Sequence, residues 1–107
     1  MLLPMVTRFS APSALSAYAR CGEAIGVARD DEGEQMTVNR LVDELRALNA
    51  ELEVPGPQAY GIARDNWFKA IPVMAEQALA SGSPANNPRV PTIEELCDLY
   101  ERAWETG

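Results

Sequence analysis

Histidine is absent from this sequence of 107 residues. Imidazole is the usual general base near neutral pH and the commonest side-chain ligand of transition metals. Without it, the Ser-His and Cys-His arrangements of nucleophilic catalysis are excluded. The chain taken alone therefore lacks the side chain on which most catalytic and metal-binding sites depend.

Basic residues are also scarce, because nine Lys and Arg stand against sixteen Asp and Glu and give a formal net charge of −7. Nucleic-acid binding needs clustered Lys and Arg that release counterions from the phosphates. Anionic membrane surfaces attract basic segments in the same way. We therefore expect neither nucleic acid nor a membrane among the partners of this chain.

Long hydrophobic runs are missing too, and cysteine occurs only twice. No apolar run approaches the roughly 18 to 20 residues that span a bilayer, and residues 1–6 lack the basic region and cleavage pattern of a signal peptide. Cys21 and Cys97 lie too far apart in the sequence to indicate a metal-ligand pair or a disulfide framework. We predict reduced, buried cysteines in a cytoplasmic protein.

The apolar residues that are present recur at helical spacing from one end of the chain to the other. No segment alternates in the manner of a strand. The predicted helices cover residues 2–9, 13–25, 38–52, 64–80 and 92–104, and Gly26 provides a stop signal for the second of them. We therefore predict an all-α fold, a compact bundle of about four to five helices that forms a single domain over residues 1–107.

The helix over residues 38–52 has the clearest apolar stripe. Its members recur at i, i+3, i+4, i+7, i+10 and i+14, which predicts a face buried in the core: Val38, Leu41, Val42, Leu45, Leu48 and Leu52. The run Val54-Pro55-Gly56-Pro57 ends this helix because proline cannot continue it.

The helix over residues 64–80 contains Pro72, which removes one backbone hydrogen bond and clashes with the preceding turn. We expect a kink there, or a short helix followed by a new one that begins near Ile71. Trp67 and Phe68 lie on the apolar face of this helix. We interpret them as packing residues rather than as a ligand-binding pair.

Carboxylates are plentiful, but none is placed as a catalytic pair. They lie on polar helix faces or in a charged loop, where solvation explains them: Glu23, Asp30, Asp31, Glu32, Glu94, Glu95 and Asp98. A paired acid/base site needs one carboxyl desolvated beside another, and no apolar setting for two of them is visible. We accordingly assign no catalytic residue and no metal ligand within this chain.

The loop over residues 81–91 is stiffened by three prolines and leads into the capping box Thr92-Ile93-Glu94-Glu95. Two interpretations of its segment Asn86-Asn87-Pro88-Arg89 remain open. The segment is a loop whose polar groups cap helices and form an ion pair, or it is the rim of a ligand pocket that another part supplies.

Together, several segments resemble the iron-containing (group III) alcohol dehydrogenases. They are Leu2-Leu3-Pro4 with Val6 and Phe9, Leu48-Asn49 with Val54-Pro55, Ala75-Glu76-Gln77-Ala78-Leu79, Asn87-Pro88-Arg89, and the terminal helix from Thr92 to Trp104. The similarity extends over essentially the whole chain and in the right order. Asn87-Pro88-Arg89 followed by the capped helix is its most specific part.

The resemblance implies a two-domain enzyme in which an α/β domain binds NAD(P) and a helical domain holds Fe²⁺ or Zn²⁺ through one Asp and three His. In that family Leu-Leu-Pro follows the last ligand histidine, so this sequence begins after the ligands. The expectation is a C-terminal piece of the helical domain that binds no cofactor by itself. The family position four residues before the Asn of Asn-Pro-Arg borders the cofactor pocket. It is Ser83 here, and Asn87 is expected to support the loop.

Two other functions remain open. The first is a stand-alone helical interaction module, which would form a homodimer through an exposed apolar face. The second is one half of a split dehydrogenase, whose partner would be a separately encoded N-terminal part. In the first interpretation, a C-terminal piece of the dehydrogenase, the chain has a structural role, closes the helical domain over the metal and is inactive by itself.

Overall fold

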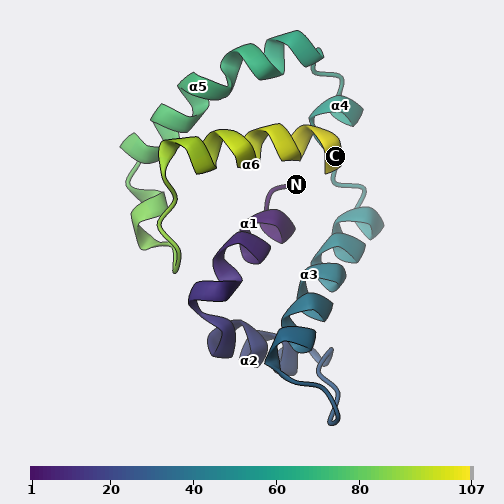
Figure 1. Ribbon diagram of the computed structural model, residues 1–107. Helices are drawn as coiled ribbons and strands as arrows, with labels where there is room; N and C mark the ends of the chain where they lie inside the picture. The colour runs from purple at the N-terminus through teal and green to yellow at the C-terminus, as the bar shows by residue number, and fades with distance from the viewer. Residues whose placement is uncertain (107) are drawn as a thin grey trace. The chain divides into compact units, whose positions relative to one another are not determined.

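The structure is a computed structural model that describes residues 1–106 and contains six α-helices, two short 3₁₀ helices and no strand in that part of the chain (Figure 1). The all-α prediction is confirmed. Five of the six helices were predicted. The additional one, α4 (Pro57–Tyr60), is a single turn in the proline-containing segment that the sequence analysis identified only as the end of a helix. It forms there because proline is favourable in the first turn of a helix, where its missing N–H is not needed.

The chain divides into two compact units, one over Leu2–Glu53 and the other comprising Met1 and the residues from Val54 onward. Each is described by itself. The first contains α1 (Leu3–Ser10), the 3₁₀ helix η1 (Ala11–Ser13), α2 (Leu15–Ile25) and α3 (Glu34–Glu51). The single domain over residues 1–107 stays a prediction.

Helix α2 begins and ends for local reasons. It begins at Leu15 rather than at residue 13, because Ser13 completes the preceding 3₁₀ turn and Ala14 is the N-cap. At its other end Gly26 has φ of 88°, a left-handed conformation that glycine adopts without steric cost, and this confirms the predicted stop. Its inward side carries Ala19 and Gly22, which are buried.

The core of the first unit lies among small and β-branched side chains. Ala11, Ala19 and Val38 are buried together, and the half-buried Leu15 and Tyr18 pack against them. Small residues on α2 allow this helix to approach α3 closely. The two helices are so close at Gly22 and Thr37 that a Cβ atom built on Gly22 would lie 2.7 Å from Cγ2 of Thr37.

The predicted apolar stripe of α3 is buried only in its first half. Val38, Leu41 and Val42 are at most 5 % exposed, whereas Leu48 is 45 % exposed and Leu52 is 64 % exposed. The prediction was therefore wrong for the last two leucines. Leu48 and Leu52 lie in and just after the last turn of α3, beyond the part of the helix that carries the buried residues Val38, Leu41 and Val42.

The second unit contains α4, α5 (Arg64–Ala80), the 3₁₀ helix η2 (Ser83–Asn86) and α6 (Ile93–Thr106). Helix α5 continues through Pro72 and its ribbon curves in Figure 1, so the alternative of two separate helices is wrong. The loss of one backbone hydrogen bond at proline is tolerated because α5 packs along α6.

Aromatic side chains join α5 to α6. Trp67 is 8 % exposed, meets the ring of Tyr100 edge-on at 6.1 Å between centroids, and donates its indole N–H to the Tyr100 carbonyl at 2.9 Å. Phe68 meets the ring of Trp104 in a similar way at 6.2 Å. The interpretation of Trp67 and Phe68 as packing residues is confirmed.

Two further sequence expectations concern exposure. Cys21 is exposed and Cys97 is half-buried, so the prediction that both thiols are buried was wrong. Cys21 lies on the side of α2 that faces away from Ala19 and Gly22. None of the helices in the described part of the chain combines the length and the hydropathy that a membrane-spanning helix requires.

Candidate functional site

The loop between α5 and α6 holds the two residues that the sequence singles out for a cofactor pocket. Gly82 has φ of 79° and turns the chain out of α5, after which Ser83 begins the 3₁₀ helix η2. The backbone N–H of Ser83 donates to Oγ of Ser81 at 3.3 Å. The amide of Asn86 donates back to the Gly82 carbonyl at 3.5 Å. The loop thus contains hydrogen bonds of its own on both sides of Ser83.

The start of α6 is fixed by the predicted capping box. The backbone N–H of Glu95 donates to Oγ1 of Thr92 at 3.2 Å, and the carboxylate of Glu95 accepts from the backbone N–H of Thr92 at 3.1 Å. Arg89 adds a charged hydrogen bond to the same carboxylate at 2.5 Å. The Thr92 N–H, assisted by the charge of Arg89, holds the pKa of Glu95 below its usual value.

Ser83 and Asn87 occupy different settings in this loop. Ser83 is exposed, while Asn87 is half-buried and donates from its side-chain amide to the Arg89 carbonyl at 2.6 Å. That bond spans the proline between them and restrains the segment that leads to the capping box. The geometry is compatible with loop support by Asn87. The place of Ser83 at the edge of a cofactor pocket stays a prediction.

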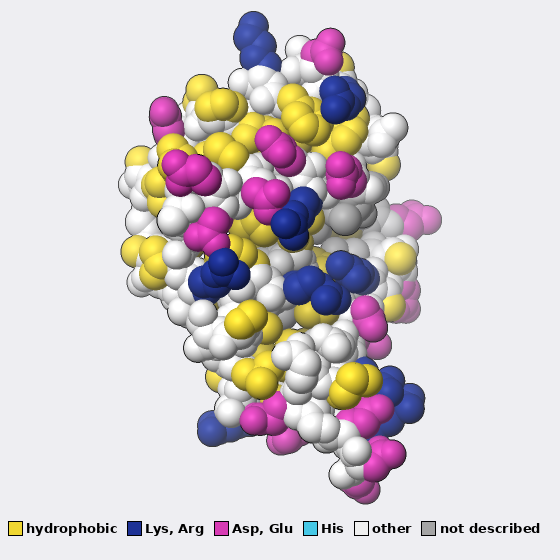
Figure 2. All heavy atoms as spheres, viewed as in Figure 1, with side chains coloured by type: hydrophobic (Ala, Val, Ile, Leu, Met, Phe, Trp, Pro, Cys, Tyr) yellow, Lys and Arg dark blue, Asp and Glu magenta, His cyan; other side chains and the backbone are white. Residues whose placement is uncertain are grey.

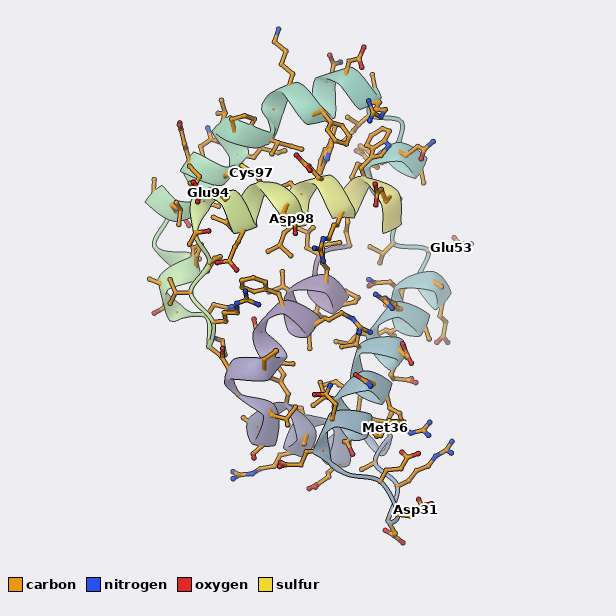
Figure 3. The ribbon with its side chains drawn as sticks, viewed as in Figure 1. Asp31, Met36, Glu53, Glu94, Cys97 and Asp98 are labelled. Atoms are coloured by element: carbon orange, nitrogen blue, oxygen red, sulfur yellow. The ribbon has the colours of Figure 1, made fainter. Side chains whose placement is uncertain are left out.

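A metal ion needs several donor side chains that converge on one point. Figure 3 shows Glu94, Cys97 and Asp98 distributed along α6, and Asp31 projecting from the loop before α3. Within residues 1–106 no three His, Cys, Asp or Glu side chains are arranged to hold a metal. With no histidine in the sequence either, the residues present do not fit the iron or zinc site that the resemblance implies.

A nicotinamide dinucleotide needs a turn between a strand and a helix whose backbone N–H groups face the phosphates. The described residues form no strand, and Ser81-Gly82-Ser83 connects a helix to a 3₁₀ turn instead. The residues present therefore do not provide a dinucleotide cradle. They could supply one edge of a pocket whose other walls lie elsewhere.

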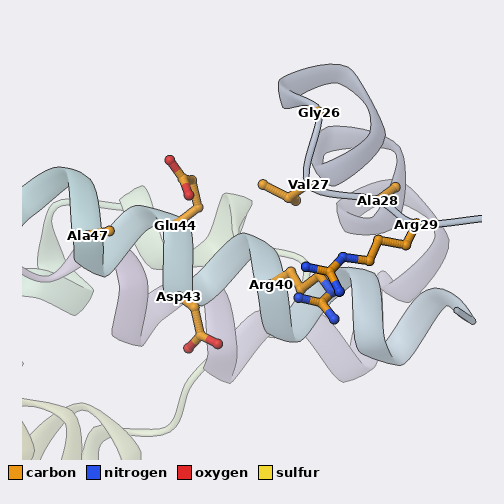
Figure 4. Close-up of a pocket in the computed structure, with 8 residues that line it drawn as sticks. All are labelled: Gly26, Val27, Ala28, Arg29, Arg40, Asp43, Glu44 and Ala47. Carbon is orange, nitrogen blue, oxygen red and sulfur yellow. The ribbon is translucent and has the colours of Figure 1, made fainter.

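A shallow hollow of about 420 Å³ lies beside α3, between this helix and the loop that follows α2 (Figure 4). Arg29 and Arg40 line it, but so do Asp43 and Glu44, whose side chains point away from the two guanidinium groups in Figure 4. Charges of both signs without convergence do not define a ligand. The hollow is a surface feature rather than a candidate active site.

The loop before α3 contains an ion pair that the sequence did not reveal. Two guanidinium nitrogens of Arg40, Nε and Nη2, each donate to one carboxylate oxygen of Glu32 at 2.5 Å, and the Glu32 side chain is only 17 % exposed. Glu32 was expected to be solvated along with Asp30 and Asp31, and for Glu32 that expectation was wrong. A separation of eight residues across a loop leaves no periodic signal from which the pair could be found.

The Glu32–Arg40 pair makes stability depend on acid. Its hydrogen bonds hold the pKa of Glu32 below the ordinary value of 4.5, so the pair stabilises the folded loop above pH 4.5 and is lost as the pH falls through the lower, folded-state pKa. We expect Glu32→Gln to lower the Tm at pH 7 and to weaken the decline of Tm below pH 4.5. Thermal unfolding between pH 7 and pH 3 measures both effects.

Asp31→Asn is the matched control for this prediction, because it removes one neighbouring negative charge and leaves the bidentate pair intact. Its Tm at pH 7 should remain near that of the parent chain. Equal losses of Tm for the two variants at pH 7 would contradict the specific role of Glu32.

A sequence profile described as the Fe-containing alcohol dehydrogenase family, C-terminal, matches residues 1–104. Three relatives of similar description match most of the chain. Lactaldehyde reductase of Escherichia coli is 29 % identical over 105 residues, which are 97 % of this chain and 26 % of the relative. The 1-propanol dehydrogenase PduQ of Salmonella typhimurium is 30 % identical over 104 residues, 94 % of this chain and 28 % of the relative.

The NADPH-dependent butanol dehydrogenase of Clostridium saccharobutylicum is 25 % identical over 100 residues, 92 % of this chain and 25 % of the relative. The chain thus spans about a quarter of the length of these relatives. No solved structure matches it.

Proposed function

Because the chain belongs to the Fe-containing alcohol dehydrogenase family and corresponds to its C-terminal part, we propose that it forms the closing portion of the helical domain of a metal- and NAD(P)-dependent alcohol dehydrogenase. The main observation behind this proposal is the family match over residues 1–104. All secondary-structure elements in the described part of the chain are helices, as expected for a helical domain. The role of this segment is structural, and by itself it has no dehydrogenase activity.

The relatives support the reaction class. Their names describe enzymes that act on lactaldehyde, butanol or 1-propanol, so an alcohol or aldehyde is the proposed substrate class of the complete enzyme. Fe²⁺ or Zn²⁺ would polarise the substrate oxygen there, and NAD(P) would exchange hydride with the substrate. We propose that this segment supplies no ligand to the metal, because the sequence has no histidine and its described residues contain no group of three donor side chains that could hold an ion. A cytoplasmic location is part of the proposal.

Ser83 is the residue of this segment that we place at the edge of the cofactor and substrate pocket. Its exposure leaves its hydroxyl accessible, and the hydrogen bonds around Gly82 and Asn87 limit the conformations of the loop that carries it. A short polar side chain at this edge would allow the nicotinamide ring of the cofactor to approach the loop closely. Bulk at this position would obstruct that approach.

A chimera tests the proposed function. In lactaldehyde reductase of Escherichia coli, the segment that matches this chain is replaced by residues 1–107 of the chain. We expect the purified chimera to reduce lactaldehyde with NAD(P)H, and Ser83→Trp in the chimera to raise the KM for the cofactor about tenfold or more, since bulk at a pocket edge costs on the order of 1 to 3 kcal/mol. The isolated chain should show no turnover.

Separate controls test the structural role of the chain, the proposed function and the position of Ser83. Elemental analysis of the isolated chain should find less than stoichiometric iron and zinc, and a stoichiometric content would overturn the structural role. A soluble chimera without lactaldehyde reduction would contradict the proposed function. Unchanged KM values for cofactor and lactaldehyde in the Ser83→Trp chimera would contradict the pocket-edge position of Ser83 alone, and Ala85→Trp, at another exposed position of the same loop, serves as the matched variant.

A second candidate is the helical interaction module that forms a homodimer. The exposure of Leu48 and Leu52 on α3 favours it, because burial of exposed apolar side chains against a second copy of the chain is energetically favourable. Sedimentation of the isolated chain over a hundredfold range of concentration discriminates this candidate from the first. A monomer at every concentration would contradict it.

A further inference from the structure

Glu95 uses both of its carboxylate oxygens, although a capping box requires only one of them. Its Oε1 accepts from the backbone N–H of Thr92 at 3.1 Å, which is the capping contact. Its Oε2 accepts from Nη2 of Arg89 at 2.5 Å. Arg89 lies in the α5–α6 loop (residues 81–91), six residues before Glu95. The second oxygen therefore joins this loop to the first turn of α6.

A series of contacts leads from Arg89 back to Ser83. The Arg89 carbonyl accepts from the side-chain amide of Asn87 at 2.6 Å, and the backbone N–H of Asn87 donates to the Pro84 carbonyl at 3.1 Å. Pro84 is bonded directly to Ser83. The rings of Pro84 and Pro88 fix φ at two positions within this stretch, so few backbone torsions are left free. A displacement of Arg89 is therefore transmitted to Ser83.

The opposite end of the loop is attached to α5 through shorter contacts. Oγ of Ser81 donates to the Ala78 carbonyl at 2.6 Å and accepts from the backbone N–H of Ser83 at 3.3 Å. Helices α5 and α6 are themselves joined by their aromatic side chains. Ser83 is thus held from both helices, and its attachment to α6 includes the ion pair described above.

An ion pair at the surface affects stability and loop conformation to different degrees. Figure 2 shows basic and acidic side chains interspersed with hydrophobic ones on the visible face of the molecule. Exposed pairs of such side chains contribute little to the free energy of unfolding. A binding loop is more sensitive, because the apparent affinity for a ligand falls in proportion to the fraction of molecules in the binding-competent conformation. A contact that is weak for stability can therefore be measurable in binding.

We propose that Arg89 and Glu95 are positioning residues that hold Ser83 at the edge of the cofactor pocket. In this role neither residue touches the cofactor or the substrate, and both act through the α5–α6 loop. The proposal rests on the proposed function, because it takes the pocket and the place of Ser83 from it. It adds the contact on which the affinity of that pocket for NAD(P) depends.

Steady-state kinetics of the chimera with lactaldehyde reductase test the proposal. Arg89→Ala removes the ion pair, whereas Glu95→Gln keeps an oxygen that accepts from the Thr92 N–H and removes the charge that attracts Arg89. We expect each variant to raise the KM for NAD(P)H about two- to fivefold with kcat nearly unchanged, the scale set by one exposed ion pair. The double variant should show the same rise as either single variant, because both remove one contact. Arg89→Lys, which keeps the charge, should restore the KM toward that of the unsubstituted chimera.

The sign of the Glu95→Gln effect separates positioning from simple electrostatics. NAD(P)H is an anion, so the loss of a negative charge near its pocket would by itself lower the KM, whereas release of the loop raises it. Arg102→Ala is the matched control, since it removes an arginine that pairs with Asp98 at 2.9 Å, one to two turns further along α6. Its KM for NAD(P)H should equal that of the unsubstituted chimera. An equal rise for Arg102→Ala and Arg89→Ala would show a general effect of lost positive charge and would overturn the proposal.

The remaining outcomes distinguish this proposal from the proposed function. In an active chimera, an unchanged KM for either Arg89→Ala or Glu95→Gln would overturn the positioning role and leave the function standing. A rise for Arg89→Ala with a fall for Glu95→Gln would indicate a direct contact of Arg89 with the cofactor phosphates, and additive rises would indicate two independent effects; each would overturn the proposal. Insolubility of the Glu95→Gln chimera alone would assign the ion pair to folding instead. A soluble chimera that does not reduce lactaldehyde would contradict the proposed function, and the positioning role fails with it.

Discussion

Trp67→Ala is expected to cost about 3 to 5 kcal/mol of stability, the range for removal of a buried aromatic side chain. Trp67 is 8 % exposed, its ring meets Tyr100 edge-on, and its indole N–H is bonded to the Tyr100 carbonyl on α6. Truncation to alanine removes the apolar contact, the ring interaction and the hydrogen bond at once. Urea unfolding, followed by far-UV circular dichroism and by the fluorescence of Trp104, measures the loss.

Trp67→Phe separates these contributions. It keeps a ring that can pack between α5 and α6 but removes the donor, so the Tyr100 carbonyl loses its partner from α5. We expect a loss of about 1 to 2 kcal/mol, the range for one hydrogen bond together with imperfect filling of the indole site. A loss below 1 kcal/mol for Trp67→Ala would contradict the role of this residue as the main connection between α5 and α6.

Gly22→Ala is expected to destabilise the first unit although alanine is the better helix former. The new Cβ would lie 2.7 Å from Cγ2 of Thr37, 3.3 Å from the Thr37 carbonyl oxygen and 3.4 Å from Cγ2 of Val27. Overpacking of this kind costs about 1 to 3 kcal/mol, against a gain of at most about 1 kcal/mol from helix propensity. Thermal unfolding of the variant should show a lower Tm.

Thr37 cannot give way easily because it is buried, β-branched and bonded through its hydroxyl to the Gly33 carbonyl at 3.3 Å. Thr37→Ser removes the methyl group that the new Cβ meets and keeps the hydroxyl. The double variant with Gly22→Ala should therefore recover about 1 kcal/mol relative to the sum of the single changes.

Ser16→Ala, an exposed position on α2, controls for substitution in that helix and should change stability by no more than about 0.5 kcal/mol. Additive losses for Gly22→Ala and Thr37→Ser would show that the two residues do not press on each other, and would contradict the close approach of α2 to α3.

Sequence and structure agree where the cause is local. Gly26 ends α2 because glycine enters the left-handed region freely, and Thr92 with Glu95 caps α6 because both partners lie within four residues. They differ where the cause is distant in the sequence. The local rules also place the start of α2 at residue 13, two residues before Leu15, because a preceding 3₁₀ turn includes Ser13.

Glu53 departs from another local rule, by which the left-handed position after a helix is usually occupied by glycine. It follows the C-cap of α3 and has φ of 54°, the only left-handed residue other than glycine within the described part of the chain. A glutamate there carries a steric cost of about 1 kcal/mol. The sequence marks the end of this helix through its prolines, but it does not say which residue adopts the turn.

The sequence by itself determined the helical composition, the local helix ends and the lack of imidazole ligands, and its motifs were sufficient to place the chain in its family. Only the tertiary structure decided which leucines of α3 are covered, that Glu32 pairs with Arg40, and that the Trp67 indole bonds to α6. Periodicity fixes which side of a helix is apolar. How much of that side is buried depends on which other elements pack against it, and the sequence of one helix does not encode that.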